Sequence, residues 1–167
     1  MTEIEKKAKA ILKRHNLYSI PIDPVVLANV NGIKVNNAVF SEEGISGLVA
    51  KRGDNVSILV KNNDSPYRKR FTIAHELGHV FLHLAKDGDF VDNNLDLFRD
   101  IEESDLNSND ASFREVESNY FAACLLMPPD LVIQAYRDDK NLNSLANKFK
   151  VSESAMGIRL NKLGLLK

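Results

Sequence analysis

Hydrophobic positions along the chain change their period several times, and each change predicts a different kind of element. From residue 2 to residue 15, apolar side chains recur every three or four positions between lysines and arginines, which predicts an amphipathic helix. Asp23 followed by Pro24 is typical of a helix start, because aspartate caps the first turn and proline fits its first position. We therefore expect a short second helix from Pro24 through Ala28.

Between residues 33 and 62 the apolar runs become short and rich in β-branched side chains, which indicates strands. Three runs stand apart, at residues 33–35, 45–50 and 56–60, with polar or glycine-bearing connections between them. We expect them to form a small antiparallel sheet of three strands. Either the second or the third strand could offer an edge to a peptide, since the pattern does not choose between them.

Two longer helices are predicted further along the chain. The first starts at the capping sequence Asp64-Ser65-Pro66 and extends to about Leu84. The second begins at Phe113 and stops at Pro128-Pro129, because proline lacks the N–H that a helix needs. Residues 86–112 show no clear period, so we expect a long loop that is either disordered or acts as a lid.

The C-terminal part reads as further helices. Residues 130–137 predict a short helix, and residues 142–160 resemble a helix-turn-helix in the spacing of their apolar positions, with Ser152 as an N-cap. Lys150 stands where the tight turn of that motif usually has glycine, and few long polar side chains follow it to read bases. The alternative is a small helical subdomain, residues 129–167, that packs on a core formed by residues 1–128.

Composition favours a soluble globular protein. The chain has 167 residues, 44% of them hydrophobic, which is enough for one compact domain with a small appendage. It shows no apolar run of membrane-spanning length and no signal sequence at its start, so we expect a cytoplasmic protein without a membrane partner. The single Cys124 agrees, since secreted proteins of this size more often carry paired cysteines.

The net charge of −1 hides an uneven distribution. Residues 86–110 contain nine acidic side chains against two basic ones, whereas residues 140–167 contain six basic side chains against Glu153 alone. A basic tail could contact nucleic acid, but a solvated helical face is the commoner explanation. Nucleic acid is therefore not the expected partner.

One stretch of the first long helix carries a chemical signature. His75 and His79 stand four residues apart, so on a helix both imidazoles project from one face and can share a metal ion. Glu76 would then lie beside the open coordination position. This H-E-x-x-H pattern is typical of zinc peptidases; two ordinary histidines on a core helix are the structural alternative.

Catalytic zinc usually takes three protein ligands and keeps one position for water, so a third ligand must come from elsewhere. Glu115 and Asn119 share one face of the second long helix, which offers the metal a carboxylate and a ligating imidazole a hydrogen-bonding amide. Glu117 falls on another side and is expected to face solvent. His83 is too far from His75 along a continuous helix to share one ion, and is expected in the core or behind a ligand.

Two segments together resemble the ImmA/IrrE family of bacterial metallopeptidases. They read RFTIAHELGH at residues 70–79 and EVESNYFAACLLMP at residues 115–128. The family form of the second segment is E-x-x-A-N/D-x-F-A-x-x-L-L-M-P, and Ser118 stands where alanine is usual, a change from one small side chain to another. The resemblance extends from residue 20 to the tail.

The resemblance implies a zinc-dependent endopeptidase of limited specificity. Such an enzyme would cleave a helix-turn-helix repressor or antitoxin and so derepress genes of a mobile element or of a stress response. Carried over to this chain, His75, His79 and Glu115 would bind one zinc ion, and Glu76 would be the general base. The expected fold is α+β, with the small sheet packed on a zincin-like pair of helices and a helix-turn-helix-like C-terminal subdomain.

Two questions stay open at the level of sequence. The first is the donor that stabilises the oxyanion, for which Tyr120 and Tyr136 are the candidates. The second is whether the chain turns over substrate at all. A regulator or partner-binding module with slow or absent catalysis, acting through its basic C-terminal helices, is the competing function.

Overall fold

The computed structural model describes residues 1–83, 90–92 and 110–166, with only the backbone placed for residues 90–92, 110 and 111. The described part contains both helices and strands, so the predicted α+β class is confirmed. In chain order the elements are α1 (Glu3–Arg14), α2 (Pro24–Val30), β1 (Lys34–Ala38), β2 (Gly47–Arg52), β3 (Asn55–Lys61), α3 (Pro66–Leu82), β4 (Phe90–Asp92), α4 (Asp110–Leu126), α5 (Pro129–Asp138), α6 (Leu142–Phe149) and α7 (Glu153–Lys162).

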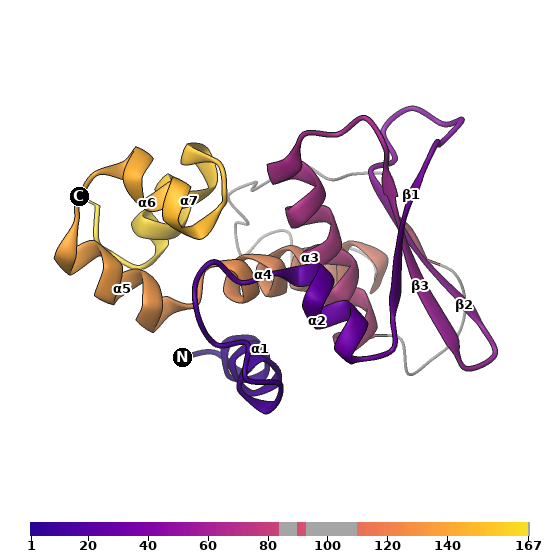
Figure 1. Cartoon of the computed structure of the whole chain (residues 1–167), viewed down its shortest axis with the longest axis horizontal. Coiled ribbons are helices and arrows are strands. Elements are labelled where there is room, and N and C mark those ends of the chain that lie inside the picture. Colours follow the sequence, from indigo (N-terminus) through magenta and orange to yellow (C-terminus); the bar gives the residue numbers. More distant parts are fainter. Residues whose placement is uncertain (84–89, 93–109, 167) are drawn as a thin grey trace.

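α3 and α4 pack against each other in the middle of the molecule, with the sheet on one side and α5, α6 and α7 on the other (Figure 1). α1 packs against α4, and α2 packs against α3 and β1. Both chain ends lie on the side of the C-terminal helices (Figure 1). Because the two longest helices have neighbours on several sides, side chains all around them can be buried.

The sheet has four strands in the order β1-β3-β2-β4. β2 and β3 form an antiparallel hairpin, but β1 pairs with β3 in parallel, with Val35 opposite Ile58. The prediction of a purely antiparallel sheet of three strands is therefore wrong. The reason is the strand order. β3 lies between β1 and β2, and β1 runs in the same direction as β3 whereas β2 runs in the opposite direction.

β4 comes from the segment 86–112, which the sequence predicts to be a loop. It pairs antiparallel with residues 47–49 at the outer edge of β2. α4 also begins within that segment, so the loop prediction is wrong at both places. The rest of the predicted lid or disordered loop, and Leu84 at the predicted end of α3, lie outside the described residues. In the described part of the chain both β2 and β3 are interior strands, so neither of the two strands considered for peptide pairing is an edge strand of the sheet.

Capping side chains determine where the helices begin. Asp23 and Ser152 accept hydrogen bonds from the first-turn N–H groups of α2 and α7, so both predicted caps are confirmed. Ser65 does the same for α3, where Pro66 takes the first helical position. Lys150 ends α6 in the left-handed conformation, with φ 56°, at the position where a glycine is usual. The tight turn between α6 and α7 therefore forms without glycine.

α3 and α4 approach each other closely because Gly78 has no side chain at their contact. A Cβ at Gly78 would lie 2.9 Å from the Cα of Ser118, closer than real Cβ atoms come. Ser118 is fully buried at this point. The backbones of the two helices can therefore pack at short range, with the H-E-x-x-H stretch facing the first half of α4.

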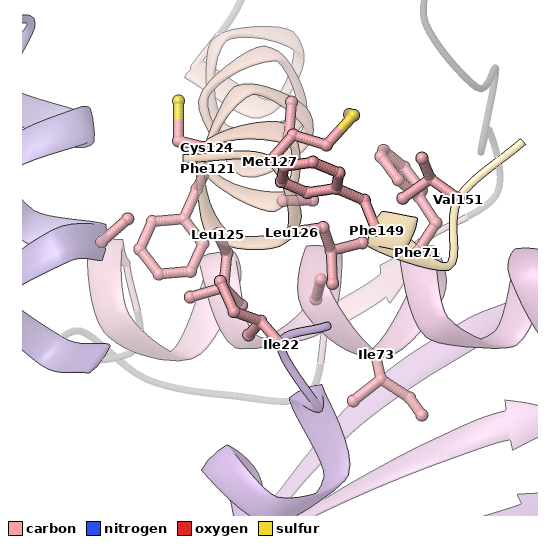
Figure 2. Packing of buried hydrophobic residues seen from close by; sticks show 14 of the residues in the cluster. Ile22, Phe71, Ile73, Phe121, Cys124, Leu125, Leu126, Met127, Phe149 and Val151 are labelled. Atoms are coloured by element: carbon pink, nitrogen blue, oxygen red, sulfur yellow. The ribbon is translucent and has the colours of Figure 1, made fainter. Parts of the chain in front are cut away.

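Apolar side chains of α4 fill the centre of the molecule. Phe121, Cys124 and Leu125 are buried. Figure 2 shows Phe149 of α6 and Val151 of the following turn among the buried side chains of α3 and α4. The C-terminal helices therefore share one core with the central pair. In the described part of the chain, none of the helices combines the length and apolar character that crossing a membrane requires.

Arg159 holds α7 against this core and is 2% exposed. Its Nε donates a hydrogen bond to Met127 O at 3.0 Å, and its Nη2 lies 3.5 Å from Glu5 Oε1. A guanidinium buried this deeply cannot reach a nucleic-acid backbone. One of the basic residues of the tail thus serves packing, while the domain boundary between residues 128 and 129 stays a prediction.

Candidate metal centre

The middle of α3 is buried although it carries three ionisable side chains. Every residue from Phe71 to His79 is buried, and His75, Glu76 and His79 are 0%, 0% and 1% exposed. Polar and ionisable groups at this depth must be paired or must coordinate a metal, because their desolvation is costly. Such clusters gather at functional sites, so this stretch is the first place to look for one.

Three side chains from two helices converge here. Nε2 of His75 lies 3.0 Å from Nε2 of His79. The carboxylate of Glu115 on α4 reaches both nitrogens: its Oε2 lies 3.2 Å from His75 Nε2, and its Oε1 lies 3.2 Å from His79 Nε2. The ligand atoms of the three residues all lie within 4.8 Å of one another. The structure therefore brings together the three residues that the sequence predicts as ligands.

The separations fit a small divalent cation. Nitrogen and oxygen ligands lie about 2.0 to 2.2 Å from zinc, so in a tetrahedral site they are about 3.3 to 3.6 Å from one another. The 3.0 and 3.2 Å separations found here are only a few tenths of an ångström shorter. Two imidazoles and a carboxylate are also ligands that catalytic zinc takes. His75, His79 and Glu115 could therefore hold a metal ion with little rearrangement.

Asn119 lies behind His75, as the sequence predicts. Its Oδ1 is 2.8 Å from His75 Nδ1. An amide oxygen can only accept, so Nδ1 carries the proton and the lone pair of the ring is on Nε2, the nitrogen that faces His79 and Glu115. The hydrogen bond also fixes the ring plane. Asn119 thus determines which nitrogen of His75 is available to a metal.

Glu115 is the side on which the cluster is open, since 33% of its side chain is exposed. Burial raises the pKa of this carboxyl, but hydrogen bonds and charge from His75 and His79 in their protonated form outweigh burial and hold the pKa well below its usual range. Glu115 is therefore ionised at neutral pH, which is the form that binds a cation.

Glu76 lies against the backbone of β2. A Cβ at Gly47 would lie 2.6 Å from Glu76 Oε1 and 2.5 Å from Thr72 Cγ2, so the strand can approach α3 only because residue 47 is glycine. Gly47 is not among the predicted site residues. The signal that could have found it is a glycine inside a β-branched run, which often marks the close approach of another group.

Two ionisable residues near the cluster are not part of it. His83 ends α3, and its Nε2 lies 3.5 Å from Glu117 Oε2. Burial lowers the pKa of His83 to about 4, and the charges of His79 and Arg114 act in the same direction. Glu117 was predicted to face solvent, but only 26% of its side chain is exposed. Burial raises the pKa of its carboxyl. Glu117 is partly covered because α1 and α3 both pack on α4, which the position of a residue on its own helix does not reveal.

The two tyrosines considered for the oxyanion are engaged elsewhere. The Tyr120 hydroxyl donates to Glu5 Oε1 at 3.1 Å, and the Tyr136 hydroxyl donates to Leu165 O at 3.0 Å. Both acceptors belong to parts of the chain outside the metal cluster. The structure therefore gives neither tyrosine a place at the site.

Comparison with known proteins agrees with this site. The family model of peptidase M78, described as the IrrE N-terminal-like domain, matches residues 28–161, which include all three candidate ligands and Glu76. No curated protein matches the sequence. Among solved structures, a Mycobacterium tuberculosis transcriptional regulator is similar, with a TM-score of 0.67 and 18% sequence identity, and the match covers 96% of this chain. The chain spans 47% of that regulator's length, and at this identity the likeness concerns the fold alone.

Proposed function

The chain belongs to the peptidase M78 family, the IrrE N-terminal-like proteins, and on that premise we propose that it is a zinc-dependent endopeptidase. The observation that carries the proposal is the convergence of His75, His79 and Glu115. Glu76 adds to it, because a fully buried carboxyl next to a ligating histidine is placed to move a proton.

Each residue has a separate task in the proposed reaction. His75, His79 and Glu115 would hold the zinc ion, which when bound lowers the pKa of its water toward neutrality and polarises the scissile carbonyl. Glu76 would take a proton from the attacking water and return it to the amine nitrogen that leaves. Peptide hydrolysis then needs no reactant besides water. Asn119 would keep the His75 ring in the productive tautomer.

The architecture supports the same assignment at the level of helices. α3 carries the H-E-x-x-H stretch, α4 carries the proposed third ligand, and β2 runs beside the proposed general base. We interpret this as a zincin-like arrangement. We assign residues 1–128 to this peptidase domain. We also assign residues 129–167 to a helical subdomain, in which α6, a tight turn and α7 follow one another in the order of a helix-turn-helix. The buried Arg159 supports packing rather than DNA reading as its task.

We propose a helix-turn-helix repressor or antitoxin as the substrate, cleaved in the cytoplasm. The support is the ImmA/IrrE resemblance and the similarity in fold to a mycobacterial transcriptional regulator. β2 is the strand that would lie along the substrate, because its first residue, Gly47, lies against Glu76. β4 pairs with residues 47–49 of β2, so a peptide would extend or replace β4 at this edge.

The decisive experiment measures zinc and cleavage in the same preparations. We expect about one zinc ion per wild-type chain and cleavage of a helix-turn-helix regulator, the first candidate being any such regulator encoded beside the gene. Glu76→Gln keeps the size of the side chain but cannot accept the proton, so we expect the zinc to stay and cleavage to stop. If Glu76→Gln still cleaves the regulator, the proposed role of this residue is wrong.

The competing function is distinguished in the same assay. A partner-binding module without turnover would bind the regulator equally well as wild type and as Glu76→Gln, and would cleave it in neither form. His79→Ala serves as the control for the metal, because it removes a ligand and should lose both zinc and cleavage.

A further inference from the structure

A pocket of about 260 Å³ opens where the start of α3, the end of α4 and the start of α7 meet. Phe71, Leu126, Met127, Val151 and Ala155 give it an apolar floor, and Arg68 stands at its rim. The floor residues are almost fully buried, whereas Arg68 keeps 34% of its side chain exposed. Figure 2 shows Phe71 and Val151 among the buried side chains of this region. The pocket thus has an apolar base and a polar mouth.

Its volume indicates what it can hold. Sites for drug-sized molecules measure about 300 to 1,000 Å³, whereas a cavity of about 150 Å³ accepts benzene. At about 260 Å³ the pocket lies between these sizes. One large apolar side chain, such as leucine or phenylalanine, therefore fits it better than a free cofactor would.

The pocket and the metal centre share the same two helix faces. Arg68 precedes His75 by seven residues, and Leu126 follows Asn119 by seven residues. Seven residues are about two turns, so each pair lies on one face of its helix and about 10 Å apart along the axis. The pocket and the candidate ligands therefore lie on the same side of the α3–α4 pair, two turns from each other.

A direct chain of contacts also joins them. Arg68 donates hydrogen bonds to Ser46 Oγ from Nε at 3.1 Å and from Nη2 at 2.9 Å. Ser46 precedes Gly47, the residue whose backbone lies against Glu76. A peptide that follows the start of β2 away from Glu76 would therefore pass the rim of the pocket. An extended chain advances about 3.3 Å per residue, so about three residues cover the distance.

We propose that this pocket is a substrate subsite that takes one large apolar side chain, about three residues from the peptide bond that is cleaved. The inference rests on the proposed endopeptidase function and adds a rule of specificity to it. Binding there would hold a protein substrate by a side chain remote from the metal, which positions the scissile bond.

The first test detects occupation of the pocket without any cleavage. The chain has three methionines, Met1, Met127 and Met156, and of these only Met127 lines the pocket. In the zinc-loaded full chain with ¹³C-labelled methionine methyl groups, N-acetyl-L-leucinamide or N-acetyl-L-phenylalaninamide should shift the Met127 signal at millimolar concentration. N-acetyl-L-alaninamide should leave it unchanged. If none of the three compounds shifts the Met127 methyl signal, the proposal is wrong.

Matched variants show whether the shift comes from the pocket. Ala155→Leu places a larger side chain on the floor and should abolish the shift, whereas Ser154→Leu adds the same side chain at the exposed neighbouring position and should not. Val151→Ala enlarges the pocket and should favour the phenylalanine compound over the leucine compound. Val151→Ala keeps the test valid if Ala155→Leu does not fold.

The last arm links occupation to cleavage. Among the products of a degenerate peptide library, wild type should enrich large apolar residues about three positions from the cut. Ala155→Leu should move that preference to small residues. Cleavage with the same preference in both proteins would refute the subsite and leave the peptidase assignment intact. If the Met127 signal shifts but neither the library nor the regulator is cleaved, the proposed function fails and the subsite with it.

Discussion

Two buried clusters of ionisable side chains in the described part of the chain are built on opposite principles. One joins Glu5 of α1 to Arg159 of α7, with side chains that are 9% and 3% exposed. The other joins His75 and His79 of α3 to Glu115 of α4. Both connect elements that are distant in sequence, and both bury groups that are costly to take out of water. They differ in whether each hydrogen-bond acceptor has a donor within the cluster.

In the first cluster, donors and acceptors balance. Glu5 accepts from the backbone N–H of Thr2 at 2.8 Å and from the Tyr120 hydroxyl at 3.1 Å, and lies 3.5 Å from Arg159. Arg159 also donates to Met127 O at 3.0 Å. A carboxylate opposite a guanidinium needs no further ion. We interpret this cluster as structural, tying both ends of the chain to α4.

In the second cluster, atoms that bind cations face one another. Two imidazole nitrogens 3.0 Å apart and a carboxylate at 3.2 Å from each make a site rich in acceptors, and Asn119 directs the lone pair of His75 into it. Such a site is complete with a divalent cation or with an added proton. Burial of charge alone therefore does not indicate a functional site. Several buried acceptor atoms that face one another do indicate one.

The largest expected effect is a loss of stability when the cluster of Glu5 and Arg159 is broken, with the metal cluster unaffected. Arg159→Met leaves Glu5 buried opposite an apolar side chain, and removing one partner of a buried ion pair costs about 3 to 5 kcal/mol of the free energy of unfolding. Denaturant unfolding measures this loss. Adding Glu5→Gln should recover part of it, because the buried charge is then removed as well. Zinc content per folded chain should stay at the wild-type value; a lower content would mean that the two clusters are not independent.

The next effect concerns Glu76 and leaves both clusters in place. Gly47→Ala puts a methyl group at 2.6 Å from Glu76 Oε1, so the carboxylate or the strand must move. Displacing a catalytic group by about 1 Å costs on the order of 100-fold in rate, and we expect such a fall in kcat with zinc content unchanged. Gly157→Ala is the matched control, since a Cβ there meets nothing closer than 4.0 Å. Equal rates for both variants would contradict the role given to Gly47.

The smallest effect is expected at Asn119. Asn119→Ala removes the acceptor for His75 Nδ1, and loss of such a partner typically weakens metal binding by about 10- to 100-fold. Competition with a chelator measures the zinc affinity. Asn119→Asp keeps an oxygen acceptor and should stay close to wild type. A wild-type affinity in Asn119→Ala would show that the ring of His75 is held by its packing alone.

Local chemistry determined much of what could be predicted. Proline and capping side chains set the starts of α2, α3 and α7, because these signals act within one turn. The period of 3.6 residues placed His75 with His79, and Glu115 with Asn119, on shared helix faces. The predictions that proved wrong concern relations between elements. The parallel pairing of β1 with β3 depends on strand order, and the partial burial of Glu117 depends on what packs on α4.

The sequence by itself thus determined the helices, the ligand types and their spacing, since each of these follows from interactions within a few residues. The tertiary structure alone decided that Glu115 meets two histidines more than 30 residues away, through a contact of Gly78 with Ser118 that no local pattern announces. It also decided that Gly47 admits β2 to Glu76 and that Arg159 turns inward to Glu5. These contacts result from close packing between segments that are distant in sequence, and they form only when the whole chain is folded.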